Sequence, residues 1–554
     1  MRSQTSGQYC RLRESRAVAA VSIVALVLLA ACGPAQDPQI SHLKKQGSAT
    51  QLIVHGKPFL MLGGELGNST ASSLEYLRPH WEKFRAMGIN TILAPVYWEL
   101  VEPQEGKFDF SLVDELISDA RRHDIKLVLL WFGTWKNSMS CYAPAWVKRD
   151  FERFPRAQVK NGKSMEMMTA FNRNNLEADK KAFVELMKHL QRVDGREHTV
   201  IMIQVENEVG MISDARDYYS EATKAFQSAA PQELMTYLHK HKESLQPEFR
   251  AMWGKGGFKA SGTWEDVFGK GLHTDEIFTA WYYARYVEEI TAAGKKEYPL
   301  PMFVNAALIR EGYRPGQYPS GGPLPHLMDV WKAGAPSIDF LAPDIYHGSF
   351  VEWSSKFHQA NNPLFIPEAG LSHRSAADAF YVFGQHDAMG FSPFAIESIE
   401  PEGHRLTRAY DLLNQLTPVI LEHQGKGVMA GVSVDQSRPE TRRQFGEYIF
   451  TASFEPLDRW AARPADTDPR GGAIIIPVGS DEFIVAGSGV IVTFQSVNSE
   501  RPLAGILSID EGVYENGMWK PRRRLNGDQS HQGRHMRLPY GDFQIQRVTL
   551  YQYR

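Results

Sequence analysis

Cysteine is scarce in this chain: Cys10, Cys32 and Cys141 are the three present among 554 residues. Three cysteines cannot build the disulfide framework of a small secreted scaffold. Excess charge is also missing, since 61 Lys and Arg and 64 Asp and Glu side chains leave a formal net charge of -3. A chain without a basic footprint is not expected to bind nucleic acid.

Two functional motifs are absent as well. The Gly-rich dinucleotide fingerprint of an open doubly wound sheet is missing, which argues against that fold. A metal-dependent hydrolase would need clustered His and Asp side chains at strand ends. Asp344, His347 and His373 are present, but no HxH-like pair stands at the end of a predicted strand. We therefore expect neither a cofactor nor a metal ion.

A long apolar run, "AVAAVSIVALVLLAAC" (17–32), follows Arg11, Arg13 and Arg16 near the N-terminus. It is too short for a comfortable membrane span and has the charged flank of a secretory signal. Its last four residues, up to Cys32, resemble the lipobox of bacterial lipoproteins, in which this cysteine is lipidated; an uncleaved N-terminal anchor is the alternative. We expect a signal peptide at 1–31, a flexible polar tether at 32–49, and a membrane-anchored lipoprotein in the periplasm, at the outer membrane.

Beyond the tether, short apolar runs alternate with amphipathic segments, a pattern typical of βα units around a parallel sheet. Eight apolar runs are candidate strands: 59–65, 90–96, 126–133, 199–207, 301–308, 338–346, 363–370 and 389–398. Eight such repeats close into a (β/α)8 barrel. We predict a TIM barrel over residues 50–424.

The pattern changes near Gly425. Runs such as "GAIIIPV" and "EFIVAGSGVIVTFQS" are rich in strand-forming residues and lack intervening helical segments. They predict a smaller, antiparallel, β-sandwich-like domain over residues 425–554. This domain either supports the barrel or binds glycan; its sequence contains no compact catalytic cluster.

Carboxylates stand at the ends of two predicted barrel strands. The fourth run, "TVIMIQVEN", ends in Glu206 and Asn207 and is followed by Glu208, while "PLFIPEAG" places Glu368 at the end of the seventh. Barrel active sites lie at the C-terminal ends of the strands. Two carboxylates meeting there suit glycoside hydrolysis, in which one protonates the leaving oxygen while the other attacks or activates water. The alternative is a salt-bridged scaffold.

These segments also resemble a known family. "QVENEVG" resembles the QxENEYG segment of the β-galactosidases of glycoside hydrolase family 35, and "VYWELVEPQEGKFDFS" (96–111) resembles the family's YxPWNxHEPxxGxFDF segment. "WFGTWKNSMSCYAPAWV" (131–147) is similar to the strand-three loop of a bacterial branch that includes enzymes acting on xyloglucan. The resemblance covers the barrel and, more loosely, the C-terminal part.

The resemblance implies a retaining, exo-acting β-galactosidase that releases terminal nonreducing β-D-galactose from oligosaccharides, xyloglucan-derived ones among them. It assigns Glu208 as acid/base, Glu368 as nucleophile and Asn207 as a donor to the sugar 2-hydroxyl, and leaves Glu206 as a structural carboxylate. Tyr346 matches the position from which relatives hydrogen-bond the nucleophile, although a strand-end tyrosine is often only packing.

Further sugar contacts are expected from two loops. Trp135, Lys136 and Asn137 offer an aromatic face and polar donors. Trp98 and Glu99 stand at the family's Trp-Asn positions, with Glu in place of Asn. Two alternatives remain open: a β-glycosidase of the same clan with another sugar specificity, and a non-catalytic glycan-binding lipoprotein, which need not retain both Glu208 and Glu368.

Overall fold

The computed structural model describes residues 40–139, 142–454 and 469–554. The expected signal peptide, Cys32 and Cys141 lie outside these residues. Within them, no helix is both long and apolar enough to cross a membrane.

Eight parallel strands close into a barrel in the order β10-β11-β12-β13-β4-β5-β6-β9. They coincide with the eight predicted runs, so the TIM barrel is confirmed. Most of them are completely buried, as expected of strands covered by helices on one side and by the barrel interior on the other. Their bounds are β4 (Met61–Glu65), β5 (Thr91–Tyr97), β6 (Lys126–Lys136), β9 (Val200–Asn207), β10 (Met302–Ala307), β11 (Phe340–Ile345), β12 (Ile366–Ala369) and β13 (Gly390–Pro393).

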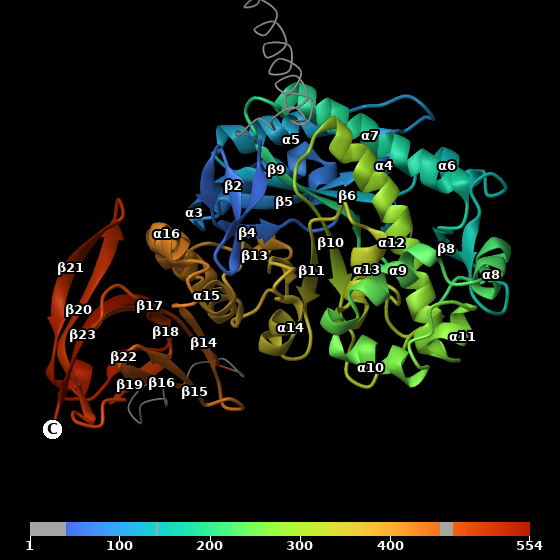
Figure 1. The fold of residues 1–554 in the computed structure, drawn as a ribbon. Coiled ribbons are helices and arrows are strands. Elements are labelled where there is room, and N and C mark those ends of the chain that lie inside the picture. The colour runs from blue at the N-terminus through green and yellow to red at the C-terminus, as the bar shows by residue number, and fades with distance from the viewer. Residues whose placement is uncertain (1–39, 140–141, 455–468) are drawn as a thin grey trace, which may run out of the picture.

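Helices surround the barrel (Figure 1). In α5, Val113, Leu116, Ile117 and Ala120 are buried, the spacing of an apolar helix face. In α7, the Asn172 side chain caps the N-terminus by accepting from two backbone N–H groups. The covering helices are α2 (Leu74–Leu77), α3 (Trp81–Ala86), α4 (Trp98–Val101), α5 (Ser111–Arg122), α6 (Ala145–Arg149), α7 (Arg173–Asp194), α12 (Leu272–Glu297), α13 (Met328–Gly334), α14 (Phe350–Phe357), α15 (Ser375–His386) and α16 (Arg405–His423).

Two insertions extend the loops of the barrel. The two-stranded sheet β7 (Arg156–Gln158) and β8 (Ser164–Met168) lies between β6 and α7. Four short helices precede α12 between β9 and β10: α8 (Ser220–Gln227), α9 (Gln232–Lys240), α10 (Pro247–Lys255) and α11 (Trp264–Phe268). Both insertions follow the C-terminal ends of barrel strands, where the site is expected.

The flexible tether predicted at 32–49 ends earlier than expected, because its last residues belong to a β-hairpin. Residues 42–49, predicted to be flexible, form β1 (His42–Gln46) and the start of β2 (Ala49–Val54), which pair antiparallel around Gly47 and Ser48 and continue to β3 (Lys57–Phe59). A two-residue turn with glycine at positive φ suits such a hairpin, and Gly47 has φ +57°. The Ser48 N–H donates to the Gly425 carbonyl at 3.0 Å, which attaches the hairpin to the chain after α16.

The C-terminal part consists of two antiparallel sheets, which confirms the predicted β-rich architecture. The six-stranded sheet has the order β14-β17-β18-β23-β20-β21 and the four-stranded sheet the order β15-β16-β19-β22. Residues such as Val485, Val492 and Val548 form a core of their own between them. Their strands are β14 (Ala430–Val434), β15 (Glu440–Phe445), β16 (Tyr448–Phe454), β17 (Gly471–Pro477), β18 (Glu482–Ser488), β19 (Val490–Ser496), β20 (Leu503–Glu515), β21 (Met518–Leu525), β22 (Met536–Leu538) and β23 (Gln544–Tyr553).

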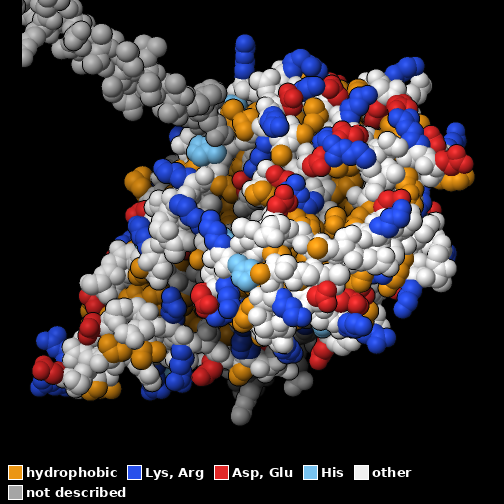
Figure 2. All heavy atoms as spheres, turned by 45° about the vertical axis from the view of Figure 1, so that its right-hand side comes forward, with side chains coloured by type: hydrophobic (Ala, Val, Ile, Leu, Met, Phe, Trp, Pro, Cys, Tyr) orange, Lys and Arg blue, Asp and Glu red, His pale blue; other side chains and the backbone are white. Residues whose placement is uncertain are grey.

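The six-stranded sheet packs against the barrel through α15 and α16, which lie between the two parts in Figure 1. Ile474, Ile476 and Ile484 of this sheet belong to the barrel's hydrophobic core. On the face in Figure 2, acidic and basic side chains are interspersed, in line with the small net charge.

Candidate active site

A cavity of about 560 Å³ opens at the C-terminal ends of the barrel strands. Its lining comes from the ends of β6, β9, β10, β11, β12 and β13 and from the loops that follow them. It combines carboxylates with amides, cations and aromatic rings: Asn68, Lys136, Asn137, Glu208, Arg310, Tyr313, Gln317, Tyr318, Asp344, Tyr346, His347, Glu368 and Phe394 are among the residues that line it.

The two predicted catalytic carboxylates meet in this cavity. Oxygen atoms of Glu208, Glu368 and Asp344 lie within 4.8 Å of one another. Glu208 is 5% exposed and Glu368 is 4% exposed, so both are shielded from bulk water. Glu208 directly follows β9 and Glu368 lies in β12, and these strands are separated in the barrel by β10 and β11. The closure of the barrel therefore brings these distant side chains together.

Hydrogen bonds hold Glu368 from two sides. The Tyr346 hydroxyl donates to its Oε2 at 2.6 Å, and the Asn305 amide donates to its Oε1 at 3.3 Å. Both donors favour the charged form of a carboxylate. Tyr346 thus lies where the family resemblance implies, against the expected nucleophile.

Glu208 has a different environment. Burial, followed by the negative charge of Glu368, raises the pKa of Glu208 to about 7. Lys136 and hydrogen bonds from Asp344 and the Asn137 amide oppose that rise. A carboxyl group with a pKa near neutrality can both give and accept a proton, as a general acid/base must.

This environment predicts the alkaline limit of activity. If Glu208 must be protonated to act, kcat/KM falls as the pH rises through about 7. In Asn137→Ala, a donor to the charged carboxylate is lost, so the pKa of Glu208 rises and the alkaline limb moves to higher pH. The profile of kcat/KM for a substrate with a poor leaving group checks this; a limb that moves to lower pH contradicts it.

Glu206 faces away from the cavity into a buried acid pair. Its Oε2 accepts from the Trp135 backbone N–H at 2.7 Å, and its carboxyl hydrogen-bonds Asp179 of α7. Burial and the charge of Asp179 raise the pKa of Glu206 well above its usual value. A side chain at Gly133 would approach the carboxyl oxygens of both acids within 3 Å, which explains the glycine there. The geometry agrees with a structural carboxylate.

The backbone around Asn207 is unusual. Glu206 and Glu208 both have positive φ, 62° and 46°, a conformation that non-glycine residues rarely adopt. Such strain is often found at functional sites. Asn207 lies between them, with its Oδ1 accepting from Gln204 at 3.0 Å and its buried Nδ2 without a partner among the described residues. Its role as a donor to the sugar stays a prediction.

Of the three sugar contacts predicted near the end of β6, two line the cavity and one does not. Lys136 and Asn137 line the cavity. Trp135 does not: it is fully buried against Tyr283 and Tyr286 of α12, at ring-centroid distances of 4.9 and 4.8 Å. Successive side chains of a strand point to opposite faces, so Lys136 in the cavity directs Trp135 towards the helices. The expected stacking of Trp135 on a sugar is therefore wrong.

Trp98 and Glu99 are also misplaced by the sequence reasoning, because neither lines the cavity. Trp98 is fully buried and its indole N–H donates to Glu102 at 3.0 Å. Glu99 pairs with Lys148 at 3.3 Å. Helix α4 begins at Trp98, directly after β5, and its turn carries both side chains away from the barrel mouth.

Sequence reasoning overlooked Asn305 and Glu65. The Asn305 amide donates to both Asp344 and Glu368, and its Oδ1 accepts from the Glu208 N–H at 2.9 Å. Glu65 ends β4 and is fully buried. A polar residue inside or at the end of an apolar run was the available signal in each case, the same signal that identifies Glu208.

Three carboxylates, those of Glu208, Asp344 and Glu368, have the donor type and spacing that a hard cation requires. The hydrogen bond between Asp344 and Glu208 indicates that these two carboxyl groups share a proton instead. Burial and the charge of Glu368 raise the pKa of Asp344 well above its usual value, and Asp344 hydrogen-bonds Glu208. This direction favours the neutral form of Asp344 beside the expected acid/base.

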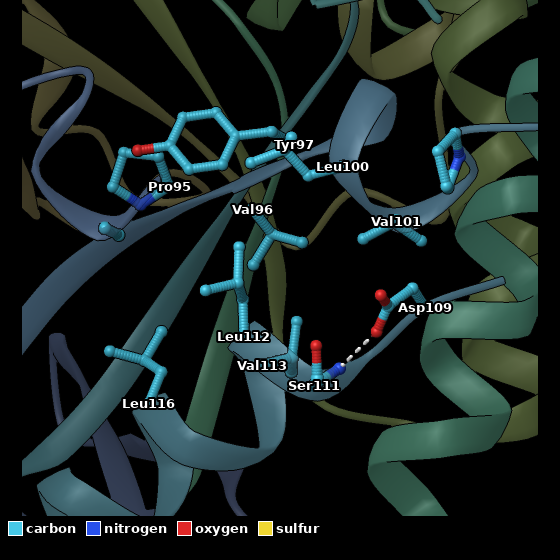
Figure 3. A pocket seen from close by; sticks show the side chains of 12 residues that line it. Pro95, Val96, Tyr97, Leu100, Val101, Asp109, Ser111, Leu112, Val113 and Leu116 are labelled. Atoms are coloured by element: carbon cyan, nitrogen blue, oxygen red, sulfur yellow. Dashed lines mark hydrogen bonds between the residues drawn. The ribbon is translucent and has the colours of Figure 1, made fainter. Parts of the chain in front are cut away.

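A second cavity, of about 240 Å³, lies between the end of β5 and α5 (Figure 3). Its lining is mainly aliphatic, with Val96, Leu100 and Leu112 among the side chains. Asp109 is the carboxylate of this lining and accepts from the Ser111 N–H at 2.9 Å. One carboxylate cannot supply the acid and base that the barrel mouth provides.

Comparison with known proteins extends the motif resemblance. Residues 51–252 match the family model "Glycosyl hydrolases family 35", and residues 406–537 match a "Domain of unknown function (DUF5597)". The "Beta-galactosidase" of Xanthomonas manihotis is 27% identical over 31% of this chain and 27% of its own length. The "Beta-galactosidase-1-like protein 3" of Rattus norvegicus is 29% identical over 35% of this chain and 31% of its own.

The chain thus spans less than a third of the length of these curated relatives. Among solved structures, the β-galactosidase of Bacillus circulans sp. alkalophilus covers 66% of this chain and 57% of its own, with a TM-score of 0.44 and 14% identity. The family match includes β9 with its Asn207-Glu208 pair and ends before β12. Over residues 51–252, the chain is thus similar to the glycosyl hydrolases of family 35, as its motifs indicated.

Proposed function

We propose that the protein is a retaining, exo-acting β-galactosidase that releases terminal nonreducing β-D-galactose. One observation carries the proposal: Glu208 and Glu368 lie in one cavity with carboxylate oxygens within 4.8 Å of one another, and burial beside Glu368 raises the pKa of Glu208 to about 7. Retaining glycosidases hold their carboxyl groups about 5–5.5 Å apart, whereas inverting enzymes leave about 6.5–9.5 Å for a water molecule.

In this mechanism, a Glu368 oxygen attacks the anomeric carbon while Glu208 donates its proton to the glycosidic oxygen, so the aglycone leaves as an alcohol. Forming the glycosyl ester removes the negative charge of Glu368. The pKa of Glu208 then falls, because that charge contributes to its rise. Glu208 next takes a proton from a water molecule while the water oxygen attacks the anomeric carbon. The ester bond to Glu368 breaks, which releases galactose and restores the Glu368 carboxylate.

The sugar specificity forms a separate part of the proposal. The β-galactosidase relatives and the loop around Lys136 and Asn137, which lines the cavity, support a galactoside substrate. The similarity of residues 131–147 to a bacterial branch with xyloglucan-active members supports xyloglucan oligosaccharides as its source.

A substrate panel tests the specificity. We expect nitrophenyl β-galactoside to be cleaved faster than the corresponding glucoside or mannoside, and xyloglucan oligosaccharides to lose galactose faster than lactose does. Initial rates at equal substrate concentration give the comparison. Faster cleavage of a glucoside or mannoside favours the alternative, a β-glycosidase of the same clan with another specificity.

We also propose that Cys32 is lipidated and anchors the enzyme outside the cytoplasm. The charged flank and apolar run before Cys32 support this location. In Cys32→Ser, we expect unprocessed or soluble protein without an acyl chain and with unchanged intrinsic activity. Detergent partitioning and mass spectrometry of the N-terminal peptide test it; an unmodified Cys32 in the parent protein rules out the lipobox interpretation.

A further inference from the structure

Glu65 is a buried acid that the mechanism above does not use. It is the last residue of β4 and is 0% exposed. Neither carboxyl oxygen accepts a hydrogen bond from any described residue, and no described cation forms an ion pair with it. An ionised carboxylate in such a place would be an uncompensated buried charge, which costs several kcal/mol in real proteins.

The surroundings of Glu65 contain more acids than cations. Glu368 and Glu208 both act on it electrostatically, and the positive charge of Lys136 opposes them. Burial, then the charge of Glu368, raises the pKa of Glu65 well above its usual value. Charge repulsion and desolvation therefore act in the same direction, towards a neutral acid.

A neutral carboxylic acid carries one O–H donor, which needs an acceptor when it is buried. The carboxyl group of Glu65 is within hydrogen-bonding reach of Glu368. Glu368 already accepts from Tyr346 at Oε2 and from Asn305 at Oε1. A carboxylate has about four lone-pair sites, so it has room for a third donor.

Resting on the proposed role of Glu368, we infer that Glu65 is a protonated acid that donates a hydrogen bond to Glu368 and so positions the nucleophile. Its place in the fold suits this task. The backbone of Glu65 bridges to Phe394, and the Phe394 ring lies 6.3 Å from that of Tyr346, the other donor to Glu368. Glu65 and Tyr346 thus hold the nucleophile from different strands of the barrel.

Two neutral substitutions test whether Glu65 acts as a hydrogen-bond donor to Glu368. Glu65→Gln keeps a neutral side chain of the same length with an N–H donor, whereas Glu65→Leu removes the donor. We expect Glu65→Gln to retain most of the rate of covalent trapping by a 2-deoxy-2-fluoro galactoside. We expect Glu65→Leu to lose on the order of 10- to 100-fold, as for one charge-assisted hydrogen bond. The acidic limb of kcat/KM should move to higher pH in Glu65→Leu alone.

Infrared spectroscopy gives a readout that does not depend on activity. The difference spectrum of the unmodified protein minus Glu65→Gln at neutral pH should contain the carbonyl band of a protonated carboxylic acid. Its absence overturns the inference and leaves the proposed function intact. If the band is present but no galactoside labels Glu368, the proposed function fails while the protonation of Glu65 stands.

Two kinetic outcomes would contradict the positioning role of Glu65. Equal losses in Glu65→Gln and Glu65→Leu, or a slower Glu65→Leu with an unchanged pH profile, would assign Glu65 a merely structural role. Glu102→Gln is the control, since Glu102 is a buried glutamate that bonds Trp98 away from the cavity. Circular dichroism checks folding; if Glu65→Leu does not fold, the infrared difference of Glu65→Gln decides by itself.

Discussion

Replacing Glu368 with Gly should reduce turnover of β-galactosides on the order of 10⁶-fold, comparable with the loss of the nucleophile in other covalent catalysts. The glycine removes the carboxylate that we propose attacks the anomeric carbon, and it leaves space beside Tyr346 and Asn305. Azide can enter this space and attack from the same side, which would give an α-galactosyl azide. The recovered rate and the configuration of that product are measured with an activated aryl galactoside.

The unmodified enzyme provides the complementary result. A 2-deoxy-2-fluoro galactoside with a good leaving group should trap the galactosyl ester, because fluorine destabilises the oxocarbenium-like transition states while the leaving group keeps the first step faster. Peptide mapping should find the label in "PLFIPEAG". Proton NMR should show a β product before mutarotation. A label on Glu206 or Glu208, or an initial α product, contradicts the assignment.

Replacing Glu208 with Ala should lower hydrolysis of natural oligosaccharides by about 10²- to 10⁴-fold, the usual contribution of general acid–base catalysis. The first step should be nearly unaffected for aryl galactosides whose leaving groups need no proton. Pre-steady-state release of nitrophenol, compared across leaving groups of different basicity, measures the difference. A rapid burst followed by slow turnover is expected, because the second step still lacks its base.

Equal losses for good and poor leaving groups would remove Glu208 from the acid role. Glu289→Ala is a suitable control, since Glu289 forms surface ion pairs with Arg173 and Lys180 outside the cavity. Exposed pairs of this kind contribute about 0–1 kcal/mol to stability, so the control should fold and act normally.

The wrong predictions of sugar contacts at the site have one physical origin. Trp135, Trp98 and Glu99 follow apolar runs just as Glu208 and Glu368 do, but their direction depends on local turns: Lys136 takes the cavity-facing position, and α4 starts at Trp98. Likewise, residues 42–49 are polar, and only pairing with Gln51, Leu52 and Ile53 shows them to be a strand. Composition does not reveal such pairing.

The sequence by itself determined the eight-stranded barrel, the β-rich C-terminal part and the two strand ends that carry Glu208 and Glu368, because burial on both faces and the period of the helices leave a local pattern. Tertiary structure alone decided what surrounds the two glutamates. Asn305, Asp344 and Glu65 come from three other strands, and their influence on proton binding depends on distance and burial after the barrel closes. A carboxyl group's charge responds to neighbours in space, and the linear chain does not contain those distances.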